Sequence, residues 1–560
     1  MRRLFLPFLF FISAVYAQDG DALLHDDVYH FMDRMDVKGY VKDGMPTDVK
    51  PYPREMLAGV LRNLAGLGGD TLGRRDRVLT ERYRFVFDDS HAKTRDSNKH
   101  VFKYVFRNRR DLLHYTKKNY KVFFNPVLGL SAGYDRTNNA GSTSFFQNTR
   151  GANIRAGLWG KLGVYADFTD NQIAFPHFID RYVRNQQVVF GEGYYKLFKQ
   201  RSFDFFNYRG YITYSPVKQL RIKFGRDRAF WGNGYQSLVL SDHATDHLML
   251  NVVTRLWKLE YVNHFAQLID YIPNKPDALG SFPRKYAVYH QLAYRPDRRV
   301  SIGLFESIIY ASTLPNGGRG FEIQYLNPII FYRAIEQYIG SSDNASLGLT
   351  LKINALKRFQ IYGQLVIDDY NFGQRKFGKG WWGNKIAWQA GIKYMDVLGL
   401  PNLDLQLETN RIRPYTYSHY NAASNYAHYG QHLTHPLGAN LHDFHAMVRY
   451  NPIADLYMQA VFSYTIIGLD YDGLKFGSNI FLPDLTHNNG EPNPDFNNFT
   501  TQGKRADIAT LWLKFDYRIW RWNAFLFLEG VYRRESENDF SGMSVSGGVR
   551  WNLPRRMARM

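Results

Sequence analysis

The 560-residue chain contains no cysteine, and this absence removes several kinds of chemistry. Without thiols there are no disulfide bonds, no thiolate zinc sites and no thiol nucleophiles. There is also no cysteine to carry a lipid beside a cleavage site, so we do not expect a lipoprotein. Long apolar runs are missing as well, because beyond the N-terminus no segment has the roughly 18 uncharged apolar residues that a membrane-spanning helix needs. The mature chain is therefore expected to have no transmembrane helix.

Acidic residues are in the minority, and the formal net charge is +20. Such a charge favours anionic partners, namely lipopolysaccharide phosphates, acidic polysaccharide or nucleic acid. The first residues indicate export: Arg2 and Arg3 precede an apolar run at 4–12, and Val15-Tyr16-Ala17 has the small-residue pattern of a cleavage site. We therefore expect residues 1–17 to be a signal peptide, and we expect no nucleic-acid partner.

From about residue 120 onwards, apolar and polar residues alternate. The clearest cases are 347–354 (LGLTLKIN) and 403–408 (LDLQLE). A strand places successive side chains on opposite faces, so this period separates a lipid face from a lumenal face. A soluble β-sandwich also alternates, but it seldom combines strands this long with 16% aromatic residues. The pattern therefore predicts a membrane β-barrel.

The alternation defines eighteen candidate strands. They are 122–135, 149–160, 161–170, 205–215, 218–226, 247–256, 257–266, 285–295, 298–309, 343–354, 357–367, 385–395, 401–412, 440–451, 453–466, 505–517, 521–534 and 541–553. Short turns such as 215–217 and 451–452 separate long loops such as 227–246 and 413–439. We predict an all-β fold: an antiparallel transmembrane barrel of about 18 strands over residues 119–560, in the outer membrane of a Gram-negative bacterium, with its long loops outside.

The segment 18–118 is predicted to be a periplasmic helical region that ends in a charged linker. Its stripes of apolar residues are Val28, Phe31, Met32 and Met35 in the first helix, Met56, Leu57, Val60, Leu61 and Leu64 in the second, and Leu79, Tyr83 and Val86 in the third. The stretch 88–118 is strongly charged and typical of a mobile or surface-hugging linker. An even number of strands leaves both ends of the barrel in the periplasm, where these helices could plug or cover the opening.

The last predicted strand carries a possible signal for the barrel assembly machinery. Ser546, Gly548, Trp551 and Leu553 have the polar, glycine, hydrophobic, hydrophobic spacing of such signals. Trp551 and Leu553 are expected to share the lipid-facing side of the strand.

The loop after the strand at 218–226 is the first candidate binding site. It contains Arg226, Asp227, Arg228, Trp231, Asn233, Tyr235 and Gln236. The aromatic rings offer flat faces to sugars, and the guanidinium and amide groups bind hydroxyls or carboxylates. The alternative is structural, because aromatic residues near strand ends form interfacial girdles and arginines near outer loops bridge lipopolysaccharide.

The segment 321–344 is the second candidate. Glu322, Asn327, Arg333, Glu336 and Asp343 suggest a charge network in a loop folded into the lumen. Paired carboxylates also invite a glycosidase interpretation, but structural ion pairing is preferred, so we expect neither an enzyme nor a cofactor.

Six histidines lie between 416 and 446. They are His419, His428, His432, His435, His442 and His445. His428 and His432 would align only on a helix, and Gly430 and Pro436 argue against one. We therefore expect a polar, aromatic outer loop and no metal site.

Several of these motifs together resemble a known family. The segments 224–242 (FGRDRAFWGNGYQSLVLSD), 326–344, 435–444 (HPLGANLHDF), 28–41 and 51–61 are similar to the Wzi family of outer-membrane capsule assembly proteins, which includes gliding-associated relatives. The resemblance spans most of the mature chain. It implies an eighteen-stranded barrel, closed by helices at its periplasmic end, that holds capsular or other exopolysaccharide. The matching positions are Arg226, Asp227, Trp231, Gly232, Asn233, Gly234 and Tyr235 in the first motif and Asn327, Pro328, Arg333, Glu336 and Asp343 in the second, and they either bind glycan or fold the loops inward.

The sequence thus predicts a monomeric outer-membrane barrel that retains surface polysaccharide through many weak contacts, whose repetition can raise effective affinity by roughly 100-fold. Three alternatives stay open. The barrel could instead bind gliding or secreted surface proteins, it could be a diffusion porin, or it could be a surface glycosidase that depends on Glu322 or Glu336.

Overall fold

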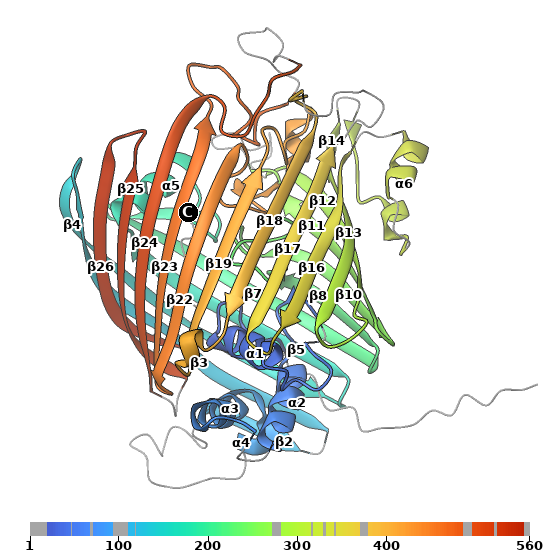
Figure 1. Ribbon diagram of the computed structural model, residues 1–560, viewed down its shortest axis with the longest axis vertical. Coiled ribbons are helices and arrows are strands. Elements are labelled where there is room, and N and C mark those ends of the chain that lie inside the picture. The colour runs from blue at the N-terminus through green and yellow to red at the C-terminus, as the bar shows by residue number, and fades with distance from the viewer. Residues whose placement is uncertain are drawn as a thin grey trace, which may run out of the picture.

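In the computed structural model, eighteen long antiparallel strands close into a barrel (Figure 1). Each strand pairs with the next long strand in the chain, and the last one, β26, returns to the first, β3. The structure describes residues 20–45, 47–67, 71–92, 110–117, 119–271, 282–314, 317–328, 332–340, 343–369, 379–484, 495–519 and 523–553. The expected signal peptide lies outside these residues.

The wall strands are β3 (Tyr120–Thr137), β4 (Gly141–Leu158), β5 (Leu162–Ala174), β7 (Ser202–Val217), β8 (Leu220–Asp227), β10 (His247–Leu256), β11 (Leu259–Ile269), β12 (Arg284–Tyr294), β13 (Val300–Ala311), β16 (Asn344–Ala355), β17 (Phe359–Asp369), β18 (Lys385–Tyr394), β19 (Leu403–Ile412), β22 (Leu441–Ile453), β23 (Leu456–Leu469), β24 (Lys504–Ile519), β25 (Ala524–Glu535) and β26 (Phe540–Trp551). Shorter strands are β1 (Val49–Lys50), β2 (Leu113–Lys117), β6 (Lys196–Phe198), β9 (Phe230–Trp231), β14 (Thr313–Leu314), β15 (Gly317–Gly318), β20 (Ala427–His428) and β21 (Gln431–His432). The helices are α1 (Asp27–Val37), α2 (Arg54–Ala65), α3 (Arg74–Phe87), α4 (Asp89–Ala92), α5 (His177–Gln186) and α6 (Tyr332–Ile339), with 3-10 turns η1 (Ile323–Leu326), η2 (Val397–Gly399) and η3 (Ala422–Ser424).

The predicted barrel and its strand number are confirmed. On β25, for example, Leu526 and Leu528 face outwards and are about half exposed, whereas Phe527 and Glu529 line a lumenal cavity. The outward faces together form the apolar belt that lipid covers. The largest difference in bounds is at β4, which begins at Gly141 instead of 149 because β3 and β4 continue as one long hairpin. Among the described residues, no helix is long and apolar enough to cross a membrane.

The helices α1, α2 and α3 lie at the end of the barrel where the strands are joined by short turns (Figure 1). Their predicted apolar stripes meet in one cluster, in which Met32, Leu61 and Tyr83 are buried together. Short amphipathic helices gain most of their stability from such packing. The helices therefore cover one opening of the barrel, and that this opening faces the periplasm stays a prediction. Residues 21–87 are called the helical cap below.

The described part of the predicted linker is ordered. Residues 113–117 form β2, which pairs with the first five residues of β3, 120–124. Asp111 is buried, where it accepts hydrogen bonds from Arg110 at 2.7 Å and from Asn125 at 2.9 Å. For 110–117 the structure therefore contradicts a mobile linker, because Arg110 and Asp111 are buried and paired and β2 is bound along β3. The half-exposed β2 agrees with the surface-hugging alternative.

Buried ion pairs join the helical cap to the lumenal face of the barrel. The Arg34 guanidinium of α1 contacts Asp404 of β19 at 2.6 Å and Asp396 of the preceding turn at 2.5 Å. Asp21 accepts from Arg221 at 2.5 Å and from Lys223 at 2.8 Å, both on β8. These lumenal charges on the strands therefore have their partners on the cap, and the protein itself neutralises them.

The attachment of the helical cap is expected to weaken in acid. Burial alone would raise the pKa of Asp21 and of Asp48, but neighbouring arginines and lysines outweigh it and hold the pKa of both carboxyls below the ordinary range. Asp111 lies outside the cap but contacts Arg110, which donates to the carbonyl of Val86 in the cap. Here too burial would raise the pKa, but Arg110 and Arg155 outweigh it and lower the pKa of Asp111 to about 2. A carboxyl with a depressed pKa contributes stability that is complete above its unfolded pKa, roughly 4, and that is lost as pH falls through its folded pKa.

Hydrogen exchange followed by mass spectrometry checks this expectation. Amides of the helical cap should lose protection between about pH 4 and pH 2, ahead of the amides of the wall strands, once intrinsic exchange rates are taken into account. Equal protection of the cap at the two ends of that range would contradict the role assigned to these carboxylates.

Candidate functional site

The loop from Arg228 to Asp246 turns into the barrel. It follows β8, on which Phe224 is exposed to the outside and Lys223 faces the lumen, as predicted. At Gly225, with φ of 143°, a side chain would collide with the carbonyl of Gly210 on the neighbouring strand at 2.3 Å. Inside the barrel, β9 pairs with β1 of the helical cap, which places Trp231 opposite Val49. The prediction of an outer loop is therefore wrong for this segment.

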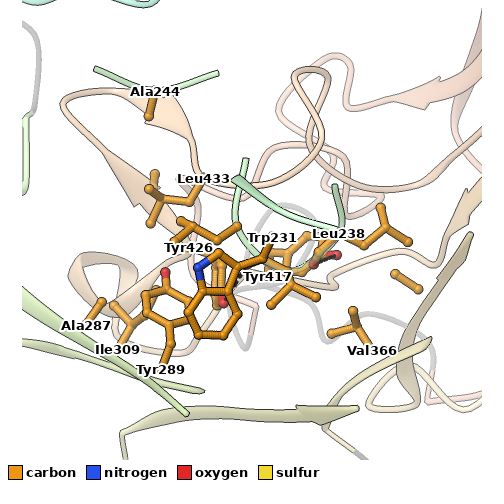
Figure 2. Close-up of a cluster of buried hydrophobic side chains, with 14 of the residues drawn as sticks. Trp231, Leu238, Ala244, Ala287, Tyr289, Ile309, Val366, Tyr417, Tyr426 and Leu433 are labelled. Atoms are coloured by element: carbon orange, nitrogen blue, oxygen red, sulfur yellow. Dashed lines mark hydrogen bonds between the residues drawn. The ribbon is translucent and has the colours of Figure 1, made fainter. Parts of the chain in front are cut away.

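Trp231 belongs to a hydrophobic core that fills part of the lumen (Figure 2). Its ring lies 5.7 Å from that of Tyr289 on the wall, and the side chain is 1% exposed. Tyr417 and Tyr426 of the segment 413–440 enter the same core, and their hydroxyls donate to backbone carbonyls of Leu238 and Val239. A ring enclosed in this way has no open face for a sugar, so the structure shows the inward-folding alternative for Trp231.

Gln236 is also fully buried. Its backbone amide donates to Glu408 at 3.0 Å, and its carbonyl accepts from the Gln389 side chain. The backbone amide of Tyr235 donates to the other oxygen of Glu408 at 2.6 Å. The carboxylate of Glu408 thus fixes the turn at 235–236 against the wall, and this positions the Tyr235 ring beside His445, 5.1 Å away.

The three charged candidates of the loop have ion-pair partners. Arg226 contacts Asp246 at 3.3 Å and lies over the Tyr208 ring on the outer surface. Arg228 contacts the other oxygen of Asp246 at 3.0 Å, and Asp227 accepts from Lys223. These contacts hold the entrance of the loop, and a role of the three residues in binding glycan stays a prediction.

Between the inward loops and the wall of β3, β4 and β23–β26 lies a cavity of about 180 Å³. Aromatic rings line much of it, among them Tyr235, Trp512 and Phe527, and three charged side chains, Lys514, Glu529 and Arg550, also border it. The indole nitrogen of Trp512 donates to Glu529 at 2.6 Å. The cavity therefore combines flat apolar faces with fixed charges, as small-molecule sites usually do.

Two smaller cavities, of about 120 and 80 Å³, continue from the main cavity towards the helical cap. The first shares Tyr235 with the main cavity, and the second shares Phe190 with it. Asn233 lines the 120 Å³ cavity and Arg228 lines the 80 Å³ cavity, so the structure brings three predicted residues, Arg228, Asn233 and Tyr235, to the same row of lumenal spaces.

The wall residues of the main cavity were missed in the sequence. Trp512, Lys514, Glu529 and Arg550 lie at the lumenal positions of β24, β25 and β26, and each looks like an ordinary strand residue on its own. The available signal was Trp512, a tryptophan on the side of a strand that otherwise carries Thr510 and Lys514. Among the described residues, Glu529 is the one carboxylate that lines the main cavity, whereas glycosidases usually act with two.

The second predicted network is not lumenal. Arg319 contacts Glu322 at 2.9 Å and Asp343 at 2.7 Å, and Asp343 also accepts from the Tyr325 hydroxyl. Arg319 of this cluster packs on the ring of Tyr310 in β13. The adjacent residue Ile309 belongs to the lumenal core, so Tyr310 faces the outside of the wall. The segment therefore covers the outside of the wall, and the placement of Glu322 and Asp343 in the lumen is wrong.

Three further residues were predicted to belong to that network: Asn327, Arg333 and Glu336. Asn327 lies on the exposed surface of the same outer segment. The side chains of Arg333 and Glu336 lie outside the described residues.

Most of the histidine-rich segment folds into the lumen, where His428, His435 and His445 are buried, so the prediction of an outer loop is wrong for these residues. His442 lies on β22 and is exposed on its outward face. His435 and His445 both contact one oxygen of Asp443, at 2.5 and 2.9 Å, and these three groups could in principle surround a cation. However, Nδ1 of His435 accepts a hydrogen bond from the backbone amide of Leu437, so Nε2 carries the proton that points at Asp443. A metal-ligating histidine needs the opposite arrangement, with its second nitrogen donating. The trio is thus held together by hydrogen bonds.

Two residues of the predicted assembly signal occupy lumenal positions. Ser546 lines the main cavity, and Gly548 packs against Ser131 of β3. Trp551 is the last residue of β26, so the strand ends two residues before the predicted bound of 553. Leu553 follows the strand and contacts Gly129 and the lumenal cavity, so the expectation that it shares the lipid-facing side with Trp551 is wrong. Recognition by the assembly machinery stays a prediction.

Comparison with known proteins agrees with this architecture. The solved structure of Wzi, described as an outer-membrane protein involved in group 1 capsule assembly in Escherichia coli and as a carbohydrate-binding β-barrel, aligns with 97% of this chain and 100% of its own, at 12% identity and a TM-score of 0.53. The fold is that of an outer-membrane β-barrel. OprD and OccK8 of Pseudomonas aeruginosa, both at 9% identity, align with 77% of this chain and with 96% and 98% of their own, at TM-scores of 0.41 and 0.40. No protein-family profile and no curated relative matches the chain.

Proposed function

We propose that this barrel binds an anionic surface polysaccharide non-covalently and holds it at the cell surface. The observation that carries the proposal is the main lumenal cavity, where the rings of Trp512 and Tyr235 lie near the cations Lys514 and Arg550. A pyranose ring has an apolar face that packs on an aromatic ring and hydroxyl or carboxylate groups that bind guanidinium and ammonium groups. The net charge of +20 also favours an acidic polymer.

The row of cavities supports a chain-like ligand over an isolated small molecule. The three spaces share lining residues and together offer several weak contact points, including Asn233 and Arg228. A polymer that engages several of them at once gains in effective affinity. In this proposal Arg228, Asn233 and Tyr235 contact glycan, whereas Trp231 and Gln236 only hold the loop in place.

The test compares two tryptophan variants in cells. With Trp512→Leu, polymer should move from the cell pellet to the medium while total polymer stays constant. Binding of an acidic oligosaccharide to the purified barrel should weaken about fivefold, since one aromatic contact contributes about 1 kcal/mol. Trp257→Leu is the control, because Trp257 is 81% exposed in the short turn between β10 and β11 and is not among the residues that line the three cavities.

Both variants must first show heat-modifiable migration, which reports a folded barrel. If polymer stays attached both in the Trp512→Leu strain and in a strain without the protein, the proposed retention of polysaccharide is wrong. A role through protein partners, as in gliding or surface-protein secretion, would then be favoured.

A further inference from the structure

The connection between β13 and β16 is the one long segment described above that packs on the outside of the wall. After Ala311 the chain turns outwards, and Phe321 packs against Phe265 of β11 and Tyr286 of β12, with ring centroids 6.4 and 5.6 Å apart. Tyr325 packs on Tyr310 at 5.3 Å. Figure 1 shows α6 of the same segment beyond β13, outside the barrel.

This outer segment reaches deep along the wall. It leaves the barrel at the long-loop end of β13, yet the carbonyl of Pro328 accepts a hydrogen bond from the Tyr261 hydroxyl. Tyr261 is the third residue of β11 from the short-turn end. The apolar belt of such barrels is roughly 25 Å tall and each residue of a strand advances about 3.3 Å. The segment therefore extends well into the depth that lipid hydrocarbon occupies around the rest of the barrel.

The wall beneath the segment is unusually polar for an outward face. Asn263, His290 and Glu306 form one row across β11, β12 and β13, since Asn263 pairs with His290 and His290 with Glu306. All three are buried, and Nδ1 of His290 lies 3.0 Å from the Tyr261 hydroxyl. By contrast, Leu304, two residues from Glu306 on the same face, is 56% exposed. Ionisable groups are costly at a lipid-facing position, so the segment replaces lipid over this sector of the wall.

The outer surface of the segment does not suit lipid either. Ile323 and Tyr338 are 75% and 84% exposed, but the amide side chains of Gln324 and Asn327 are exposed between them. The backbone at Asn327 has left the η1 turn and is not part of a strand. Irregular backbone at membrane depth is tolerated only where protein or a water-filled cavity covers it. This mixed surface of apolar and amide groups is typical of a protein interface.

In place of the monomer predicted from the sequence, we infer that a second copy of this chain covers the outer segment, so that two barrels form a homodimer in the membrane through the surface around Ile323, Gln324, Asn327 and Tyr338. Two features favour a second copy. Ile323, Gln324, Asn327 and Tyr338 are uncharged, so these four side chains bring no like charges together when two chains of net charge +20 meet about a two-fold axis. Amide groups also carry both donors and acceptors, which makes the patch self-complementary about a two-fold axis.

The absence of cysteine makes the test direct, because an introduced thiol is the only one in the chain. The variants Ile323→Cys and Tyr338→Cys are treated with a flexible bis-maleimide in native outer membranes from cells that express two differently tagged copies. The expected product is a band at twice the mass of the chain that carries both tags. Leu528→Cys on β25 is the control, since Leu528 is 51% exposed on the opposite side of the barrel and should give no such band.

A second pair of substitutions tests the same surface without a cross-linker. Ile323→Lys combined with Tyr338→Lys should halve the particle mass measured in nanodiscs while heat-modifiable migration stays normal, because like charges then oppose each other across the axis. Adducts with a different protein, no adduct despite complete thiol labelling, or a wild-type particle of single-chain mass would each overturn the homodimer.

Discussion

Replacing residues 228–246 by an Asn-Gly turn is expected to open the barrel to ions. The replacement is geometrically possible because Asp227 and His247 are paired on adjacent antiparallel strands, so a two-residue hairpin can join them. The removed loop supplies Trp231, Leu238 and Leu240 to the core that fills part of the lumen. Barrels of 16–18 strands without such filling enclose an aqueous channel. In planar lipid bilayers the variant should conduct at least about tenfold more current than the wild type.

Two point variants are measured in the same conductance experiment. Trp231→Ala removes a fully buried ring, which costs about 3–5 kcal/mol, and should give intermittent openings and a lower melting temperature. Trp257→Ala removes an exposed ring and should leave both quantities unchanged. If the excision variant conducts no better than the wild type, the inward loop does not restrict the lumen; if the wild type itself shows a stable open channel, the diffusion alternative becomes the better one.

The substitution Arg34→Ala is expected to detach the helical cap while leaving the barrel folded. The guanidinium contacts Asp76 at 3.2 Å, Asp396 at 2.5 Å and Asp404 at 2.6 Å, and the side chain is 3% exposed. Burial alone would lower the pKa of Arg34, but the three carboxylates outweigh it and raise that pKa above its ordinary value. Without the cation, these acids lie close together with little water, and breaking a buried ion pair in this way costs about 3–5 kcal/mol.

Limited trypsin digestion measures this effect, because a detached cap exposes its many basic residues. Residues 21–87 should be cleaved much faster in the Arg34→Ala protein, whereas heat-modifiable migration of the barrel is retained. Arg75→Ala is the matched control, since the hydrogen bond that Arg75 donates to the carbonyl of Pro401 is exposed to solvent. Equal digestion rates in both variants would show that the apolar contacts of the cap, and not this ion cluster, hold it in place.

The barrel wall could be predicted from the sequence because its physics is local. A strand that separates lipid from lumen must alternate, and the alternation in 347–354 is visible without any knowledge of its neighbours. The same holds for α1, where apolar residues recur at helical spacing. Even the cations of β8 were placed on the correct face, although their partner Asp21, two hundred residues away, was not foreseen.

The direction of each long loop could not be predicted in the same way. The segments 228–246 and 312–343 are both aromatic and polar, yet the first folds into the lumen, whereas Phe321 and Tyr325 of the second pack on the outer wall. Nothing in their composition distinguishes the two, because the choice depends on distant surfaces. Trp231 pairs with Val49 of the cap and packs against Tyr289 of the wall. Tyr325 packs against Tyr310 on the other side of the same sheet.

The sequence by itself determined the class of fold, the number of strands and the helical cap, since these follow from periodicities that span only a few residues. The tertiary structure decided where chemistry is possible. It enclosed Trp231, assembled a cavity from Trp512, Glu529 and Arg550 on three neighbouring strands, and covered a polar sector of the outer wall. These features depend on contacts between residues far apart in the chain, which local pattern does not encode.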